Sequence, residues 1–380
     1  MKIALVHDYL KEFGGAERVL MTLHEMFPEA PIYTAFLTPG TTVAKAFKGA
    51  KIIPSWANIF IRYFNLHSPL RFLIPLIWES FDFSGFDLVI LSSSGYLTKP
   101  IRIPKKIKVI CYCHTPPRFL YGYQTQLEWQ RYWPVKIYGH ILGHFLRLYD
   151  FLGAKRVDRF VANSRNIASR IEKFYRRDCV VIYPPIEVEK IRKFVAANKF
   201  AKPKKEFFLW AGRIVGGKGL PMVMDAANKL GINLKIAGEA AGLRWEEAEI
   251  KKRESKNIEF LGRVSDEKLW ELYATCKAFI VAEKDVDFGI VQIEAMAAGA
   301  PVIAHKSGGY LETIVDGKTG VFFKEHNAES LAAAVKRIDK MGIKKEDCQN
   351  QAEKFDRKEF VKKIKEMVSD LTVGDGDNNN

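Results

Sequence analysis

The sequence lacks two patterns that would restrict its class at once: the cysteine spacing of a structural zinc site, and long apolar runs. Its five cysteines contain no Cys-x-x-Cys pair, and Cys111 and Cys113 alternate within an apolar run, as strand residues do. Cysteines scattered in this way are typical of cytoplasmic proteins, in which the thiols stay reduced. No uncharged apolar run reaches about 18 residues, the length that indicates a transmembrane helix. The first residues enter a strand-like run without signal-peptide features, so we expect a cytoplasmic protein.

Positive charge is concentrated in the first half of the chain. The net charge is +15, and residues 1–190 hold 26 Lys and Arg against 15 Asp and Glu, whereas residues 191–380 hold 33 against 29. Such a surplus predicts an anionic partner: a phosphate-bearing substrate, anionic lipid or nucleic acid. The basic stretches lack the signatures of known nucleic-acid-binding modules, so we do not expect nucleic acid to be the partner.

Short apolar runs alternate with helical patterns along both halves, which indicates an α/β fold with parallel sheets covered on both faces. We predict two doubly wound, Rossmann-like parallel-sheet domains, each with its ligand edge at the carboxyl ends of the strands. The expected organisation is an N-terminal domain over 1–190, a lysine-rich linker over 191–206 and a C-terminal domain over 207–355. A helix over 356–371 is expected to return to the N-terminal domain, and residues 372–380 are expected to be disordered.

Two segments of the first half, residues 56–78 and 131–152, combine aromatic and leucine residues with scattered Arg, Lys and His. One interpretation is a pair of helical segments packed on the sheet with a basic outer side. The other is a surface that lies on anionic lipid, where aromatic side chains enter the interface and cations meet the headgroups. Both interpretations fit the pattern.

The first half offers two candidate binding motifs. In HDYLKEFGGAERVL, Gly14 and Gly15 precede a helix, where glycines let a phosphate or a sugar approach the backbone N–H groups. In CYCHTPPRF, His114 follows a strand directly, so it is expected at the ligand edge of the sheet. A plain turn and a histidine that braces the loop are the structural alternatives.

The second half carries a basic loop suited to a diphosphate. In FFLWAGRIVGGKGLPMVMDAA, Arg213 leaves a strand and Lys218 opens a helix. Two cations beside free helix N–H groups can bind a diphosphate. No GxxxxGK[ST] motif occurs, so hydrolysis of nucleoside triphosphates is not expected.

The stretch DVDFGIVQIEAMAAGAPVIAHKSGG allows two interpretations of its first residues. Asp285 and Asp287 could hold a divalent metal ion, or they could stand beside a sugar-nucleotide site. Gly289 is expected to begin a helix, and Glu294 within that helix can accept hydrogen bonds from ribose hydroxyls.

In combination, these motifs resemble the retaining, GT-B fold glycosyltransferases of family GT4. The resemblance rests on GRIVGGKG followed by DFGIVQIEAMAAGAPVIAHKSGGYLETIVDGKTGVFF, and on HDYL, GGAERV, SSSGYLTK, YCHTPPRFLY, VANS and YPPIEV in matching order in the first half. It implies an acceptor-binding N-terminal domain that faces a donor-binding C-terminal domain across a cleft. Within the family, the chain resembles mannosyltransferases that use GDP-mannose in cell-surface polysaccharide assembly.

The resemblance assigns roles to the candidate residues. Arg213 and Lys218 would hold the donor diphosphate and stabilise charge on the leaving group, and Glu294 would bind the ribose. His114 would contact the transferred sugar near its anomeric carbon. The remaining donor-binding candidates are Gly14, Gly15, Phe288, Gly289, Ile290 and Gly308.

One position departs from the family pattern. The family pairs two glutamates eight positions apart, and the residue eight positions before Glu294 is Val286, whose side chain cannot hydrogen-bond a sugar hydroxyl. We expect Asp287 to supply the missing carboxylate as a catalytic residue, with Asp285 second and Glu283 third. Reduced activity is the alternative outcome.

The resemblance also implies the cofactors and partners. Arg213, Lys218 and the helix dipoles can neutralise the diphosphate, so no metal ion or other cofactor is expected, and Asp285 and Asp287 are interpreted as facing sugar or solvent. The expected partners are a nucleotide-sugar donor and a glycan or polyprenyl-linked glycan acceptor. The surplus of positive charge and the two aromatic segments, rather than the resemblance, add an anionic membrane surface that would hold the enzyme peripherally on its cytoplasmic face. A sugar-nucleotide epimerase of the same fold and a catalytically impaired homologue stay open as alternatives.

Overall fold

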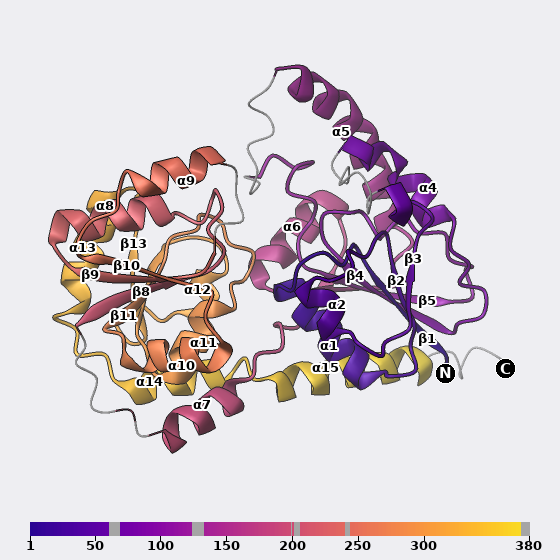
Figure 1. The fold of residues 1–380 in the computed structure, drawn as a ribbon. Helices are drawn as coiled ribbons and strands as arrows, with labels where there is room; N and C mark the ends of the chain where they lie inside the picture. The colour runs from indigo at the N-terminus through magenta and orange to yellow at the C-terminus, as the bar shows by residue number, and fades with distance from the viewer. Residues whose placement is uncertain (61–68, 124–132, 199, 201–205, 240–243, 374–380) are drawn as a thin grey trace. The chain divides into compact units, whose positions relative to one another are not determined.

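The computed structural model describes residues 1–60, 69–123, 133–198, 200, 206–239 and 244–373 (Figure 1). These residues form two compact units. Unit 1 comprises the described residues of 1–123, 133–185 and 360–373, and unit 2 those of 186–359. Residues 191–197, which the sequence analysis assigned to a linker, belong to helix α7 of unit 2, and residues 199 and 201–205 of that segment lie outside the described residues.

Unit 1 is built on a seven-stranded parallel sheet in the order β3-β2-β1-β4-β5-β6-β7. The strands are β1 (Ile3–His7), β2 (Ile32–Thr34), β3 (Ile52–Pro54), β4 (Leu88–Ser93), β5 (Lys108–Cys113), β6 (Arg159–Ala162) and β7 (Cys179–Val181). All six residues of β4 are buried, as expected for a central parallel strand covered on both faces.

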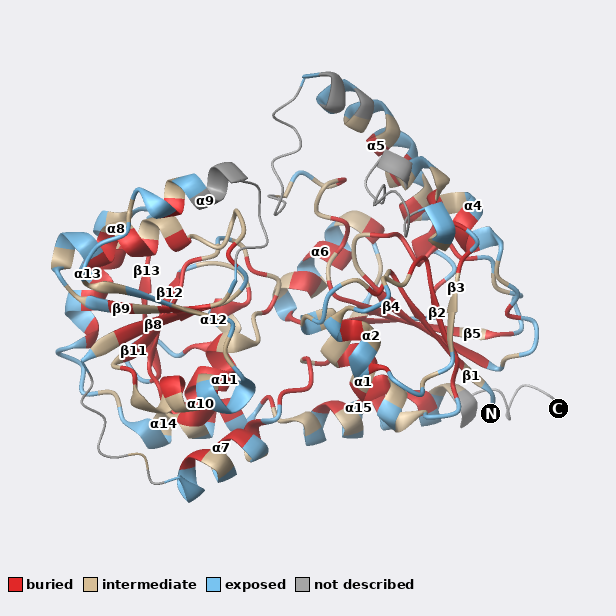
Figure 2. Cartoon of the chain, viewed as in Figure 1, coloured by how far each residue is buried: buried red, intermediate tan, exposed pale blue. Residues whose placement is uncertain are grey.

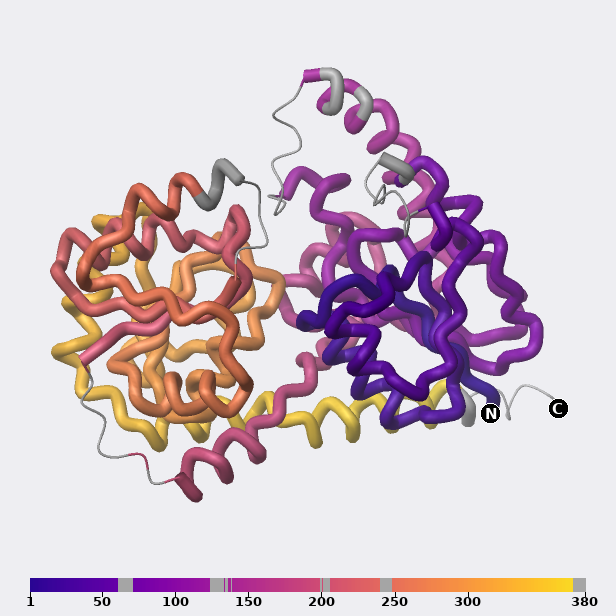
Figure 3. The backbone as a smooth tube through the Cα atoms, in the orientation of Figure 1, coloured from indigo at the N-terminus to yellow at the C-terminus, as the bar shows by residue number. Residues whose placement is uncertain are grey.

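Helices cover both faces of this sheet. They are α1 (Gly15–Met26), α2 (Thr42–Ala46), the 3-10 helix η1 (Pro69–Leu73), α4 (Ile74–Glu79), α5 (Trp133–Ala154), α6 (Arg165–Tyr175) and α15 (Arg357–Val373). Helix α15 is the last element of the chain, and its path is followed most easily in Figure 3. Its apolar residues Phe360, Ile364 and Val368 pack with those of α1 and of the central strands. The C-terminal helix therefore contributes to the core of the N-terminal unit.

Unit 2 contains a six-stranded parallel sheet in the order β10-β9-β8-β11-β12-β13. Its strands are β8 (Phe207–Ala211), β9 (Asn233–Ala237), β10 (Ile258–Gly262), β11 (Ala278–Val281), β12 (Val302–His305) and β13 (Gly320–Phe323). Its helices are α7 (Val188–Ala197), α8 (Leu220–Leu230), α9 (Arg244–Lys251), α10 (Asp266–Thr275), α11 (Val291–Ala298), α12 (Tyr310–Thr313), α13 (Ala328–Ile338) and α14 (Lys345–Glu353).

Local sequence explains where several of these helices begin. Ser164, Ser265 and Asn327 precede α6, α10 and α13, and each side-chain oxygen accepts a hydrogen bond from a backbone N–H in the first turn. Such caps satisfy donors that the helix itself leaves unpaired. The two parallel-sheet units confirm the predicted α/β fold class.

None of the helices in the described part of the chain is both long and apolar enough to cross a bilayer.

Candidate functional site

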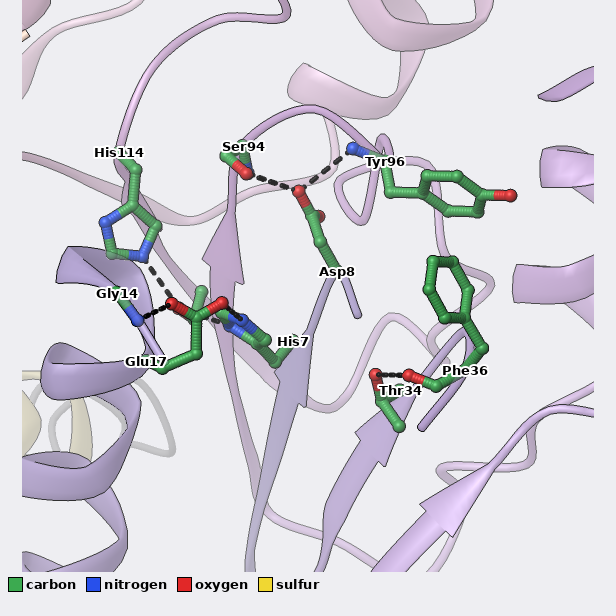
Figure 4. A network of polar contacts seen from close by, with 10 residues as sticks. His7, Asp8, Gly14, Glu17, Thr34, Phe36, Ser94, Tyr96 and His114 are labelled. Atoms are coloured by element: carbon green, nitrogen blue, oxygen red, sulfur yellow. Dashed lines mark hydrogen bonds and ion pairs between the residues drawn. The ribbon is translucent and has the colours of Figure 1, made fainter. Parts of the chain in front are cut away.

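The carboxyl ends of three neighbouring strands in unit 1 bring together a serine and two histidines, and Figure 4 labels both histidines. His7 ends β1, Ser92 lies near the end of β4 and His114 follows β5. Ser92 Oγ lies 2.9 Å from His7 Nδ1 and 2.8 Å from His114 Nε2. His7 Nε2 lies 3.4 Å from Glu17 Oε1, and the other oxygen of Glu17 accepts the Gly14 N–H at 2.9 Å. A hydrogen-bonded chain thus connects the start of α1 to His114.

The positions of the protons along these hydrogen bonds follow from which groups can donate and which can only accept. Burial disfavours the charged form of Glu17, but the interactions with His7 and the hydrogen bonds from backbone N–H groups together outweigh burial and lower the pKa of the carboxyl group. An ionised carboxylate only accepts hydrogen bonds, so the ring of His7 donates from Nε2. With Nδ1 unprotonated, that nitrogen accepts the Ser92 hydroxyl proton. Ser92 Oγ then accepts the Nε2–H of His114. This tautomer leaves His114 Nδ1 as a hydrogen-bond acceptor.

His114 is held in its neutral form. Its side chain is buried, and burial lowers its pKa to about 3, a shift to which the neighbouring His7 ring adds. Asn163 fixes the backbone there, because its side-chain amide donates to the His114 carbonyl at 2.8 Å. At neutral pH His114 can therefore hydrogen-bond a ligand, but it does not act as a cation.

The depressed pKa of His114 predicts a dependence of stability on pH. The unfolded chain takes up a proton at this residue below its ordinary pKa of about 6.5, whereas the folded protein does so only near pH 3. Its contribution to stability is therefore complete above about pH 6.5 and is lost as the pH falls toward 3. Between pH 7 and pH 5 the loss is about 2 kcal/mol. Urea unfolding of wild type and of His114→Gln measures it, and identical pH dependence in the two proteins would contradict the assignment.

Asp8 organises the loop that follows β4. Its Oδ2 accepts hydrogen bonds from the backbone N–H of Ser94 at 2.8 Å, the Ser94 hydroxyl at 2.7 Å and the backbone N–H of Tyr96 at 2.9 Å. Its Oδ1 is buried and has no hydrogen-bond partner among the described residues. Ser94, the first residue after β4, is thereby fixed beside the end of β1 (Figure 4).

In unit 2, the basic loop between β8 and α8 lies against the end of β11. Gly219 has φ +72°, and a Cβ there would come within 2.6 Å of the Ala282 carbonyl oxygen. Only glycine allows this approach, which places Lys218 in an ion pair with Glu283. Arg213, at the start of the same loop, is exposed. The two predicted diphosphate-binding cations therefore stand at the carboxyl edge of the sheet.

The loops after β11 and β12 are packed on each other. Gly308 has φ +58°, and a Cβ there would lie 2.3 Å from the Val286 carbonyl oxygen. The same carbonyl accepts the Gly309 N–H at 2.9 Å, and Ser307 Oγ accepts the Asp285 N–H at 2.9 Å. Because β8, β11 and β12 are neighbours in the sheet, all three loops occupy one edge.

Helix α11 begins at this edge. Gly289 has φ +83°, and Ile290 is the N-cap residue. The side-chain amide of Gln292 donates to the carbonyl oxygens of Phe288, at 3.1 Å, and Gly289, at 2.9 Å, which secures the turn that enters the helix. Glu294 follows in the first turn and is buried.

The predicted donor-binding residues of unit 2 lie together in that unit. Those of unit 1 form a second group in their own unit. Val286 is buried, with 8% of its side chain exposed, while Asp285 and Asp287 on either side are half-buried. Which carboxylate serves the sugar stays a prediction, as do the assigned roles of the other candidates. In unit 1, Gly14 is the N-cap of α1 and Gly15 its first residue.

The sequence analysis did not find His7, Asp8, Glu17 or Ser92. The sequence did offer a signal, because His7 and Ser92 lie near the ends of the apolar runs KIALVHD and FDLVILSSS. It did not show that β1, β4 and β5 are neighbours in the sheet. No group of three or more His, Cys, Asp or Glu side chains arranged to hold a metal ion occurs among the residues that the structure describes.

Comparison with known sequences finds two family matches. The family described as Glycosyltransferase Family 4 matches residues 13–190, and that described as Glycosyl transferases group 1 matches residues 192–355. The alpha-1,3/1,6-mannosyltransferase ALG2 of Dictyostelium discoideum is 24% identical over 98% of both chains. An uncharacterised glycosyltransferase of Methanocaldococcus jannaschii is also 24% identical; the match covers 57% of this chain and spans 60% of that protein.

Solved structures share the fold. HepE of Anabaena, in complex with UDP and glucose, is 18% identical with a TM-score of 0.68, covering 97% of this chain and 99% of its own. Sucrose-phosphate synthase of Thermosynechococcus elongatus is 15% identical with a TM-score of 0.76, covering 98% and 100%. These similarities confirm the predicted GT-B fold.

Proposed function

Because the chain belongs to the group 1 glycosyltransferases of family GT4 and is therefore a hexosyltransferase, we propose that it transfers mannose from GDP-mannose to a glycan acceptor with retention of anomeric configuration. The proposal rests on the arrangement of residues at the carboxyl edge of the sheet in unit 2. There a glycine contact fixes Lys218 beside Glu283, in the same loop as Arg213 and next to the turn that enters α11.

The chemistry of this edge suits a nucleoside diphosphate. Arg213 and Lys218 provide positive charge for the diphosphate, which gains negative charge as the glycosidic bond breaks. In this proposal Glu283 orients the Lys218 ammonium before the donor binds. Glu294, buried in the first turn of α11, is assigned to the ribose hydroxyls. These cations can neutralise the leaving group without a metal ion, so we propose metal-independent transfer.

The choice of mannose as the donor sugar rests on the names of the relatives that sequence comparison finds. The ALG2 protein of Dictyostelium discoideum, named as a mannosyltransferase, aligns with nearly the whole chain, and the ALG2 protein of Schizosaccharomyces pombe is 23% identical over 84% of it. A UDP-sugar is the second candidate donor, because the structurally similar HepE binds UDP and glucose.

The acceptor side is assigned to unit 1. His114, neutral at neutral pH, would hydrogen-bond the transferred sugar, and the chain from Glu17 through His7 and Ser92 would hold its ring in one tautomer. In a retaining reaction of this kind the acceptor attacks the face from which the diphosphate leaves, and the protein contributes positioning and charge stabilisation. A glycan, free or carried on a polyprenyl lipid, is the proposed acceptor.

The proposal is tested by incubating the purified protein with GDP-mannose or UDP-glucose and a panel of glycan and polyprenyl-linked glycan acceptors, with EDTA present. We expect an α-linked mannosyl product from GDP-mannose at an unchanged rate in EDTA, with the linkage read by NMR. A β-linked product would contradict retention. Loss of activity in EDTA with recovery in Mn²⁺ would contradict metal independence and assign Asp285 and Asp287 to a metal.

A further inference from the structure

Helix α5 exposes a long apolar face. Six large apolar side chains recur along one side of its 22 residues, each about half exposed or more, with Trp133 at 73% and Phe145 at 64%. These residues, here called the α5 face, are Trp133, Ile137, Ile141, Phe145, Leu148 and Leu152. Their spacing of three or four positions aligns them on a single side of the helix. Figure 2 shows the exposed residues that recur along α5.

The opposite side of α5 is fixed to unit 1. Gly143, Leu146 and Asp150 are buried there, and a Cβ at Gly153 would come within 2.5 Å of Pro100. Asp150 forms a fully buried ion pair with Lys99, at 2.9 Å. The helix therefore cannot rotate to bury the α5 face against its own unit, and that face is available to a partner.

The charges beside the α5 face have one sign. Lys136 lies between its first residues and Lys155 follows its last, and both are exposed. The single acidic residue of the sequence from Trp133 to Ala154 is Asp150, which is completely buried. Glu79 of the neighbouring helix α4 is exposed and lies near Tyr149. An apolar helix side bordered by cations, on a helix that itself carries no exposed acid, is typical of a helix that lies in the interface of an anionic bilayer.

Neighbouring elements extend the apolar surface. Phe72 of η1 and Leu76 of α4 are about half exposed. Residues of α4 and α5 belong to one core, against which Leu142 and Tyr149 of α5 pack. An exposed apolar surface built from several elements is larger than the scattered exposed residues of ordinary monomers, and it indicates a binding surface.

We propose that the α5 face docks unit 1 on the surface of a membrane that contains anionic lipid, with the helix axis parallel to the bilayer and Lys136 and Lys155 at the headgroups. A second copy of the chain fits the face less well. Two α5 helices in contact would bring like charges together, and neither helix carries an exposed acid to pair them, whereas anionic headgroups complement them. This surface would place the enzyme beside a lipid-linked acceptor, but its membrane affinity does not depend on the proposed donor chemistry.

The test is co-sedimentation of the full-length protein with vesicles, without nucleotide. Vesicles of phosphatidylcholine alone are compared with vesicles containing about one third phosphatidylglycerol. We expect binding to the anionic vesicles that weakens steeply with added salt. The triple variant Ile137→Ser/Ile141→Ser/Phe145→Ser should bind at least about tenfold more weakly. Val180→Ser, a change at an equally exposed apolar residue of the same unit, should bind as wild type does.

A charge variant gives an independent measurement. Lys136→Gln should weaken binding to anionic vesicles about fivefold and leave binding to phosphatidylcholine unchanged, because one cation near such a surface is worth about 1 kcal/mol. Equal binding by the wild type and the triple variant, or no binding by wild type, would overturn the proposal. A dimer in analytical ultracentrifugation that the triple variant dissociates would also overturn it, and would assign the face to a second copy of the chain.

Discussion

Replacing Lys218 by alanine is expected to lower kcat for transfer by about 10²–10³-fold, because one preorganised charge on the leaving diphosphate is lost. The substitution also leaves Glu283 without its cation at the edge where the diphosphate is proposed to bind. Two negative groups would then face each other there, so the affinity for the nucleoside diphosphate should fall as well. Initial rates of transfer and calorimetric titration of the nucleotide measure the two effects.

The matched control for this change is Lys229→Ala. Lys229 lies on α8, the helix that Lys218 precedes, and it pairs with Glu329 on the exposed surface. Surface pairs of this kind contribute little, so the control should keep wild-type rates and affinity. Lys218→Arg keeps the charge and should retain part of the activity. Wild-type transfer by Lys218→Ala would remove this lysine from the diphosphate site.

Replacing Lys99 by methionine is expected to destabilise the protein by about 3–5 kcal/mol. Burial alone would lower the pKa of Lys99, but Asp150 together with Cys111 and Cys113 outweighs burial and raises it above its ordinary value, so Lys99 is charged in its ion pair with Asp150. Asp150 also accepts hydrogen bonds from the hydroxyls of Tyr121, at 3.1 Å, and Tyr175, at 2.7 Å. Without Lys99, the carboxylate stays buried without a counter-charge. Urea unfolding of the full-length chain measures the change.

Two further variants separate the charge from the packing. Lys155→Met removes an exposed lysine from the same unit and should change stability by less than about 1 kcal/mol. The double change Lys99→Met/Asp150→Leu removes both buried charges and should recover much of the loss. A loss of less than about 1 kcal/mol in Lys99→Met would show that the pair does not hold α5 on unit 1 in the way described.

Most strands were predictable from the sequence as apolar runs, and two short ones were not. The runs KIALVHD, FDLVILSSS and KVICYCH contain β1, β4 and β5, and the six strands of unit 2 match the runs FFLWAGR, LKIAG, IEFLGR, AFIVAE, PVIAHKS and GVFF. Strands β2 and β3 were missed because each has three residues and lies beside or contains a proline. They pair in the sheet because β1 offers them a parallel neighbour, which is a tertiary effect.

Motifs located the candidate residues, while their partners required the three-dimensional structure. His114 stood out because it follows a strand directly, but its neutral state depends on burial and on His7, which lies on a strand far away in the sequence. Lys218 was recognised in its loop, and its pairing with Glu283 depends on the close approach of Gly219 to Ala282. The exposure of the α5 face likewise could not be read from the sequence pattern, and docking on anionic lipid stays a prediction.

Calorimetric titration of the purified protein with GDP, UDP and ADP, each in EDTA, tests the central claim most directly. We predict that GDP binds, that EDTA does not weaken it, and that Lys218→Ala reduces the affinity while Lys229→Ala does not. Selective binding of UDP would keep the transferase site and replace the donor. Absence of binding by all three nucleotides would contradict the account and would favour a catalytically impaired relative, with Val286 as the residue that departs from the family.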